Sequence, residues 1–153
     1  MRVGLGFDVH AFGGDRPLVL GGVTVEGPGL AGHSDADVVA HAVADALLGA
    51  AGLPDRGTLF PAGDDRYAGA DSMVLLGEVA GRVKGAGYRV GNVDVVIVAE
   101  QPRLGPHMRV MAENLARVVG GPVWVKPKRG EGLGAIGRAE GIAAMAVALL
   151  EEG

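Results

Sequence analysis

The chain has 153 residues, of which 48% are hydrophobic and 21% are charged, and its formal net charge is -4. This size and balance predict a single globular domain over residues 1–153 and exclude a disordered chain. The sequence has no cysteine, so disulfides and a cysteine nucleophile are excluded, and a metal must be held by His, Asp or Glu. The negative charge disfavours nucleic acid as a partner, and no apolar run approaches the roughly 20 residues that span a bilayer. We therefore expect a soluble, cytoplasmic protein with no nucleic-acid or membrane partner.

The first half of the chain predicts two strands and a helix. Residues 2–9 and 18–25 are β-branched and interrupted by glycine, which is typical of two strands that lie next to each other. The pattern Ser34-Asp35-Ala36-Asp37 resembles a capping box, and the apolar residues after it recur at helical spacing. We expect the helix to begin near Asp35 and to end at the glycines of residues 49–52.

A long polar segment separates this helix from the next. Residues 53–69 are rich in Gly, Pro and Asp, and loops of this length in a compact domain are usually functional or mobile. The part from Asp55 to Asp64 is therefore a candidate lid over a substrate. After it, Asp71-Ser72 predicts the cap of a second helix that runs to about Lys84.

The second half predicts a central strand and further helices. Residues 90–100 form a nearly continuous apolar stretch, which is typical of a strand covered on both faces. A helix over residues 106–119, a strand over 122–126 and a final, very apolar helix over 139–150 complete the order β-β-α-α-β-α-β-α. The pattern predicts an α+β two-layer sandwich, with a mixed sheet of about four or five strands and helices on one face, and the last helix suggests burial in an oligomer.

Polar residues with metal-binding or anion-binding chemistry gather in the first part of the chain. Asp8 and His10 lie two apart on a strand, so they leave the same face and can reach one ion, or they form a hydrogen-bonded surface pair. His33 and His41 flank the start of the first helix, where free N–H groups favour an anion, although each histidine could instead be structural. An Asp-His-His set with an open fourth position would be typical of a catalytic zinc site.

A second polar group lies near the C-terminus. The basic run Lys126-Pro127-Lys128-Arg129 and the glycines after it predict a phosphate site, with Glu131 as a ligand of a bridging cation, or else a solvated loop. The pattern Gly132-Leu-Gly-Ala-Ile-Gly137 matches a dinucleotide fingerprint, but the sequence has too few residues after it for the second strand of such a fold. No motif of the familiar hydrolases or nucleoside triphosphatases is present, which favours a mechanism without a protein nucleophile.

Several motifs together resemble one known family along almost the whole chain. They include Gly6-Phe-Asp-Val-His10, Leu20-Gly-Gly-Val23, Gly32-His-Ser-Asp-Ala-Asp-Val38, His41-Ala42, Asp45-Ala-Leu-Leu-Gly-Ala50, Phe60-Pro61, Gly69-Ala-Asp-Ser72 and Gly137-Arg-Ala-Glu-Gly-Ile142. On these residues the chain is similar to the 2-C-methyl-D-erythritol 2,4-cyclodiphosphate synthases. The resemblance implies a metal-dependent lyase of non-mevalonate isoprenoid biosynthesis. It also implies a homotrimer with active sites between subunits and, in its central cavity, a possible isoprenoid diphosphate.

The resemblance also implies which residues form the site. The zinc ligands, or ligands of another divalent transition metal, fall on Asp8, His10 and His41, and Glu131 matches a ligand of magnesium or manganese at the substrate diphosphate. His33 matches a residue credited with transition-state stabilisation, and Arg129 occupies a second such position. The implied substrate-binding residues are Asp8, His10, His33, Ser34, Asp55, Gly57, Phe60, Asp64, Ala99, Pro102, Arg103, Leu104, Gly105, Lys128, Arg129, Glu131, Ala135 and Arg138.

The chain departs from the family pattern at three places. Residues 127–130 read Pro-Lys-Arg-Gly where the family has a threonine-rich stretch, so Arg129 replaces a threonine. Ala62 replaces an aspartate, and Arg56 stands in an Asp-Arg-Gly triplet where isoleucine is commoner. These departures leave open a non-catalytic trimer that binds cytidine nucleotides or isoprenoid diphosphates. A metal-dependent phosphohydrolase is a further alternative.

Overall fold

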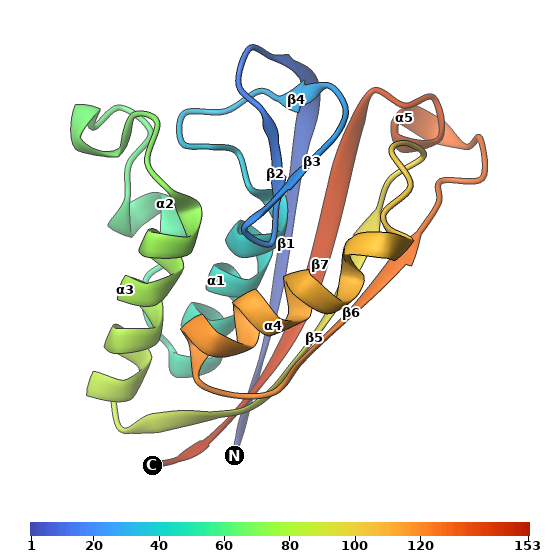
Figure 1. The fold of residues 1–153 in the computed structure, drawn as a ribbon. Helices are drawn as coiled ribbons and strands as arrows, with labels where there is room; N and C mark the ends of the chain where they lie inside the picture. Colours follow the sequence, from blue (N-terminus) through green and yellow to red (C-terminus); the bar gives the residue numbers. More distant parts are fainter.

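The computed structural model describes all residues from 1 to 153 and shows an α+β fold in two layers (Figure 1). One layer is a five-stranded mixed sheet with the order β4-β1-β7-β5-β6, in which only β5 and β6 are parallel. Its strands are β1 (Arg2–Gly14), β4 (Gly29–Leu30), β5 (Tyr88–Val98), β6 (Val123–Lys128) and β7 (Gly141–Glu152). The other layer contains the three main helices, α1 (Val38–Ala51), α3 (Ser72–Gly85) and α4 (Met108–Val119). Short helical turns are α2 (Arg56–Leu59), η1 (Asp65–Tyr67), η2 (Gly105–His107) and α5 (Gly134–Gly137).

Helix α1 lies closest to the sheet, against β1 and β7, and almost all of its residues are buried. Two glycines of β1 make this approach possible. A Cβ atom at Gly4 would lie 2.0 Å from the carbonyl oxygen of Ala46, and one at Gly6 would lie 1.9 Å from that of Ala42. Since no side chain fits between them, the backbones of β1 and α1 pack directly, which brings the next residues on this face of β1 close to α1.

The expected final helix over residues 139–150 is wrong, because this segment is strand β7 at the centre of the sheet. It pairs with β1 on one side and β5 on the other, both antiparallel. Its alanines on the helix side, Ala144, Ala146 and Ala148, are buried, and their small size fits the close packing of α1. Alanine favours helices in isolation, but here pairing with two distant strands overrides that local preference.

The expected strand over residues 18–25 is two short strands, β2 (Leu18–Leu20) and β3 (Val23–Val25), that form a separate hairpin. Gly21 and Gly22 join them with φ angles of 55° and 72°, which suits a two-residue turn that only glycine-like residues adopt easily. The hairpin does not pair with β1, whose neighbours are β4 and β7, so the expected pairing is also wrong. The turn is instead bound to the start of α1 through Asp37.

Both helix caps involve aspartates of the predicted motifs. Helix α1 begins at Val38, three residues later than expected, because the side chain of Asp37 accepts a hydrogen bond from the backbone N–H of Ala40. Helix α3 begins as predicted, with Asp71 as its N-cap, and continues to Gly85. The helix expected over 106–119 consists of η2 followed by α4.

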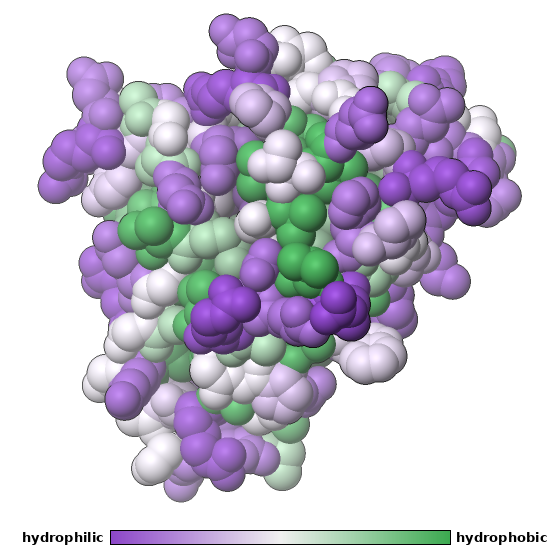
Figure 2. All heavy atoms as spheres, viewed as in Figure 1, coloured by the Kyte–Doolittle hydropathy of each residue, from purple (hydrophilic) through white to green (hydrophobic).

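The two faces of the sheet differ sharply. In the view of Figure 2, hydrophilic residues cover much of the rim and of the helix surfaces, with hydrophobic residues showing between them. The opposite face carries no helix, and its apolar side chains are exposed because they alternate with the residues that face α1. They include Val3, Leu5, Phe7 and Val9 of β1 and Met145 and Val147 of β7. None of the helices has both the length and the apolar character required to cross a membrane.

Candidate functional site

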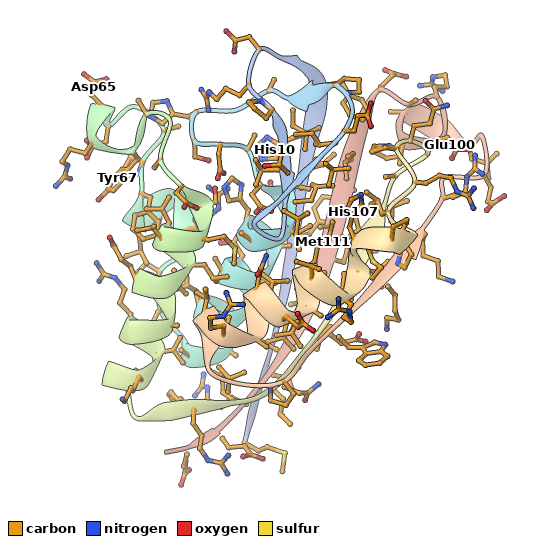
Figure 3. The ribbon with its side chains drawn as sticks, in the orientation of Figure 1. His10, Asp65, Tyr67, Glu100, His107 and Met111 are labelled. Carbon is orange, nitrogen blue, oxygen red and sulfur yellow. The ribbon has the colours of Figure 1, made fainter.

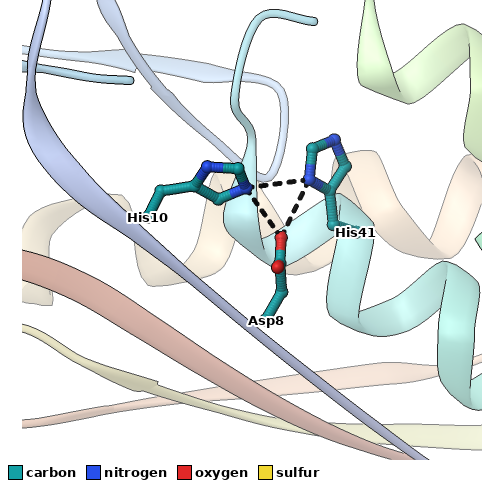
Figure 4. Close-up of side chains that lie close together, drawn as sticks. All are labelled: Asp8, His10 and His41. Atoms are coloured by element: carbon teal, nitrogen blue, oxygen red, sulfur yellow. Dashed lines mark hydrogen bonds and ion pairs between the residues drawn. The ribbon is translucent and has the colours of Figure 1, made fainter. Parts of the chain in front are cut away.

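Asp8, His10 and His41 form a compact cluster between β1 and α1 (Figure 4). The Oδ2 atom of Asp8 lies 2.9 Å from Nε2 of His10 and 2.9 Å from Nδ1 of His41, and these two nitrogen atoms are 3.3 Å apart. The period of the strand directs Asp8 and His10 to the same face, as predicted, and α1 supplies His41. One carboxylate oxygen and two imidazole nitrogens that converge on one point are a donor set for zinc or a similar divalent metal.

The outer nitrogen of each histidine is hydrogen-bonded away from the cluster. Nδ1 of His10 is 2.7 Å from the carbonyl oxygen of Ala31, which can only accept, so this nitrogen donates, and in the neutral ring it is Nε2, facing Asp8, that offers a lone pair to a metal. Nε2 of His41 is 2.8 Å from Oγ of Ser72, which in turn donates to the carboxylate of Asp35. In the neutral ring, Nδ1 of His41 is therefore also the nitrogen that offers a lone pair to a metal. Such outer contacts orient ligands and raise their basicity.

The cluster itself has the electrostatics of a ligand set. Partial burial pushes the pKa of Asp8 upward, but hydrogen bonds from His10 and His41 outweigh this effect and hold the pKa well below its usual range. The same contact with Asp8 raises the pKa of His10. A proton on His10 therefore competes with a metal, and we expect metal affinity to fall as the pH is lowered.

Replacing Ser72 with alanine is expected to weaken metal binding about 10- to 100-fold, the usual effect of removing an outer contact of a ligand. His41 would lose the hydroxyl that accepts its Nε2 proton, so its orientation and tautomer would be less well defined. Competition with a chromophoric chelator measures the affinity. Thr24→Ala, an exposed hydroxyl on β3, is the matched control. Equal affinities for the wild type and Ser72→Ala would show that Ser72 only fills space.

His33 and Ser34 connect the cluster to the segment predicted as a lid. Oγ of Ser34 lies 3.2 Å from Nε2 of His41, and Nε2 of His33 lies 3.1 Å from the carbonyl oxygen of Asp64. Within this segment, Asp55 precedes α2, and the carboxylate of Asp64 is paired with Arg66. The structure thus places Ser34 against the cluster and connects His33, its neighbour in the chain, to the segment predicted as a lid.

Gly57 and Phe60, two other expected residues of this segment, differ in their exposure to solvent. Gly57 is exposed within α2, whereas the Phe60 side chain is buried and packs edge-on against Tyr67 with ring centroids 5.2 Å apart. A contact between Phe60 and a substrate would therefore use its backbone.

A second group of expected residues lines a pocket of about 940 Å³ at the ends of β5 and β6. Its lining residues are Ala99, Glu100, Pro102, Arg103, Leu104, Gly105, Pro106, Pro127, Lys128, Arg129 and Glu131. Eight of these are the residues expected from the sequence, namely Ala99, Pro102, Arg103, Leu104, Gly105, Lys128, Arg129 and Glu131. Three cationic side chains and exposed backbone groups give this pocket the chemistry of an anion site.

One pocket residue and two expected residues outside the pocket lining follow β6. Glu131 has a φ angle of 54°, a left-handed conformation that is uncommon for a side chain of this type and that is often found at functional positions. Ala135 lies in α5, and Arg138 follows it and forms an exposed ion pair with Glu140. Glu131 is not part of the Asp8-His10-His41 cluster, so any cation that it binds is a different one.

Within one chain the cluster and the pocket are separate. The cluster is on β1, the pocket follows β5 and β6, and β7 lies between β1 and β5 in the sheet. Figure 3 shows His10 and Glu100 on opposite sides of β7. Since neighbouring strands are about 5 Å apart, the two sites are separated by roughly 10 Å or more.

Four residues that hold these sites in place were not predicted as site residues, although Asp37 and Ser72 belong to the predicted helix caps. Asp37 and Ser72 act through α1 and His41, and Glu100 binds Arg129. The carboxylate of Asp45 accepts a hydrogen bond from the backbone N–H of Arg56 and so ties α2 to α1. Asp45 lies one helical turn after His41 and begins one of the family motifs, and these are the signals in the sequence that could have indicated it.

Comparison with known proteins gives the family. The model of the YgbB family matches residues 1–151. This chain belongs to the YgbB family. A 2-C-methyl-D-erythritol 2,4-cyclodiphosphate synthase of Moorella thermoacetica is 55% identical over 154 residues, which cover 98% of this chain and 94% of that protein. A synthase of Thermosynechococcus vestitus is 50% identical over all of this chain and 98% of its own length. The family resemblance predicted from the sequence motifs is therefore confirmed.

One curated relative is longer. The bifunctional enzyme IspD/IspF of an Anaeromyxobacter species is 54% identical over 98% of this chain, which spans 40% of that protein. Among solved structures of the family, a cyclodiphosphate synthase in a CDP-bound form has a TM-score of 0.89 and 38% identity, with 98% of this chain and all of that chain covered. The bifunctional IspDF of Campylobacter jejuni has a TM-score of 0.95 and 40% identity, with 99% of this chain and 42% of that chain covered.

Proposed function

We propose that this chain converts 4-diphosphocytidyl-2-C-methyl-D-erythritol 2-phosphate to 2-C-methyl-D-erythritol 2,4-cyclodiphosphate and CMP. The observation that carries the proposal is the convergent cluster of Asp8, His10 and His41, in a chain that matches curated synthases along its whole length. The proposal includes a single synthase domain over residues 1–153, supported by one continuous hydrophobic core, and a place in cytoplasmic isoprenoid biosynthesis.

The donor set fits the metal that the family implies. Two imidazoles and one carboxylate leave a fourth tetrahedral position open, and the hydrogen bonds of His10 and His41 direct their lone pairs toward that centre. When bound there, zinc or a similar metal supplies Lewis-acid polarisation of a phosphate oxygen. Glu131 would hold a magnesium or manganese ion together with oxygens of the substrate diphosphate, because hard cations prefer carboxylate and phosphate oxygens.

The proposed reaction requires the protein to orient the substrate and to neutralise its charge, but it requires no protein nucleophile. An oxygen of the substrate's 2-phosphate forms a bond to the diphosphate phosphorus that carries the methylerythritol. The bond from that phosphorus to the oxygen of CMP breaks, and CMP leaves with the electron pair. Arg103, Lys128 and Arg129 place positive charge around the pocket, and we assign them to the nucleotide phosphates. Ser34, beside the cluster, and His33, its neighbour in the chain, would position the attacking phosphate.

The proposed assembly is a homotrimer, in which the cluster of one subunit meets the pocket of its neighbour. Two observations support it, namely the separation of the two sites within one chain and the uncovered apolar face of the sheet. We expect this face to surround the central cavity. An isoprenoid diphosphate in that cavity would place its phosphates near Arg138.

Replacing Leu5 with aspartate is expected to dissociate the trimer, because Leu5 is 69% exposed in one chain and lies between Val3 and Phe7 in the apolar row of β1 on the uncovered face. The mass measured by sedimentation should fall from about three times 15.4 kDa to that of the monomer, and CMP release should be lost. Val74→Asp introduces the same charge at a similarly exposed position on α3 and should leave both unchanged. A monomeric wild type would contradict the assembly.

The function is tested by incubating the purified, metal-loaded protein with 4-diphosphocytidyl-2-C-methyl-D-erythritol 2-phosphate and identifying both products by mass. Equal amounts of CMP and cyclic diphosphate would support the synthase. A linear hydrolysis product, or binding of the substrate without release of CMP, would overturn the proposal in favour of a phosphohydrolase or a binding protein.

A further inference from the structure

Glu100 joins the two segments that form the pocket. It follows β5, and its carboxylate reaches the residues that follow β6. One oxygen, Oε1, accepts a hydrogen bond of 2.9 Å from Nη2 of Arg129, and the other, Oε2, accepts one of 2.9 Å from the backbone N–H of Gly130. The side chain of Glu100 is only 16% exposed, whereas that of Arg129 is 65% exposed. A largely covered carboxylate is thus paired with an exposed cationic side chain.

The two donors bound by Glu100 are of the kind that proteins use for phosphate. Guanidinium groups and backbone N–H groups of glycine-containing turns both bind phosphate oxygens. Glu100 and Arg129 line the same pocket, together with Lys128 and Arg103. Partial burial works against ionisation of Glu100, but its bonds with Arg129 and Gly130 outweigh this and hold its pKa below the usual range. An internal anion therefore occupies Arg129, which lines a candidate anion pocket, and the N–H of Gly130, the residue next to it.

We propose that Glu100 competes with the nucleotide phosphate for Arg129 and the Gly130 N–H, and so lowers the affinity of the pocket for CMP. The proposal rests on the proposed function for the identity of the nucleotide. Its consequence for turnover is easier release of CMP, because each time the nucleotide leaves, Glu100 replaces it on the same donors. This competition moderates the strong phosphate binding expected of Arg129, which stands where the family pattern has a threonine.

The replacement Glu100→Gln tests the role of the negative charge independently of the hydrogen bond to Gly130. The amide oxygen can still accept from Gly130, so the turn stays in place, but the negative charge that neutralises Arg129 is lost. We expect CMP to bind about fivefold more tightly, the scale of one partly exposed ion pair. Arg129→Ala should weaken CMP binding, and in that background Glu100→Gln should have almost no effect, because the cation for which it competes is absent.

Titration calorimetry of the intact protein with CMP, at fixed magnesium and without phosphate buffer, measures the four affinities of this cycle. Glu113→Gln removes a surface carboxylate paired with Arg109 at 2.7 Å on α4, and should not change CMP binding. Weaker or unchanged binding in Glu100→Gln, or tightening that persists without Arg129, would overturn the proposal. If the wild type binds and releases CMP, such a result concerns Glu100 alone. If no variant binds CMP, both this proposal and the proposed function fail.

Discussion

Replacing His41 with alanine is expected to remove the bound metal and to lower the rate of CMP release by at least about a thousandfold. A metal that acts as a Lewis acid contributes several kcal/mol to a phosphoryl transfer, and each 1.36 kcal/mol corresponds to a factor of ten. His41 is almost fully buried, and its Nδ1 lies against both other members of the cluster, so no exposed side chain can take its place. Metal content by mass spectrometry and CMP release are measured on the same samples.

Asp8→Asn tests the same site with almost no change of shape, since the amide keeps the size of the carboxylate but not its charge. It should resemble His41→Ala in both metal content and rate. His107→Ala, outside the cluster, is the control for loss of a histidine. Full activity of a metal-free, correctly folded His41→Ala protein would refute the assignment of the cluster to catalysis.

Replacing Asp37 with alanine is expected to lower the free energy of unfolding by about 3 to 5 kcal/mol. The side chain is completely buried and accepts hydrogen bonds from the backbone N–H groups of Gly21, Gly22 and Ala40, at 2.9, 2.8 and 3.0 Å. Loss of an N-cap costs about 1 kcal/mol, and buried donors without a partner add about 1 to 3 kcal/mol each before the structure relaxes. Urea unfolding followed by circular dichroism measures the change.

Asp71→Ala provides the comparison, because Asp71 also caps a helix through its side chain but is exposed. We expect it to cost only about 1 kcal/mol. Equal losses for the two variants would mean that the β2–β3 turn contributes nothing through Asp37. A larger loss at Asp37 would show that this residue attaches the hairpin to the helix that carries His41.

Several features of this protein follow from its sequence alone, because they depend on spacing within one element. The alternation of a strand places Asp8 and His10 on one face, and aspartates before apolar runs indicate the starts of α1 and α3, although α1 starts three residues late. The family was also recognisable from its motifs, and with it the assignment of His41 as a ligand. Spacing by itself could not connect His41 to residues more than thirty positions earlier.

Tertiary structure decided the features that depend on contacts between distant segments. Residues 141–152 are a strand because β1 and β5 supply hydrogen-bonding partners on both sides, which no local preference of alanine reveals. The cluster forms because Gly4 and Gly6 let α1 lie directly on β1. The bond between Glu100 and Arg129 likewise depends on the parallel pairing of β5 with β6, which brings the ends of two strands together and leaves a carboxylate beside the cation of the pocket.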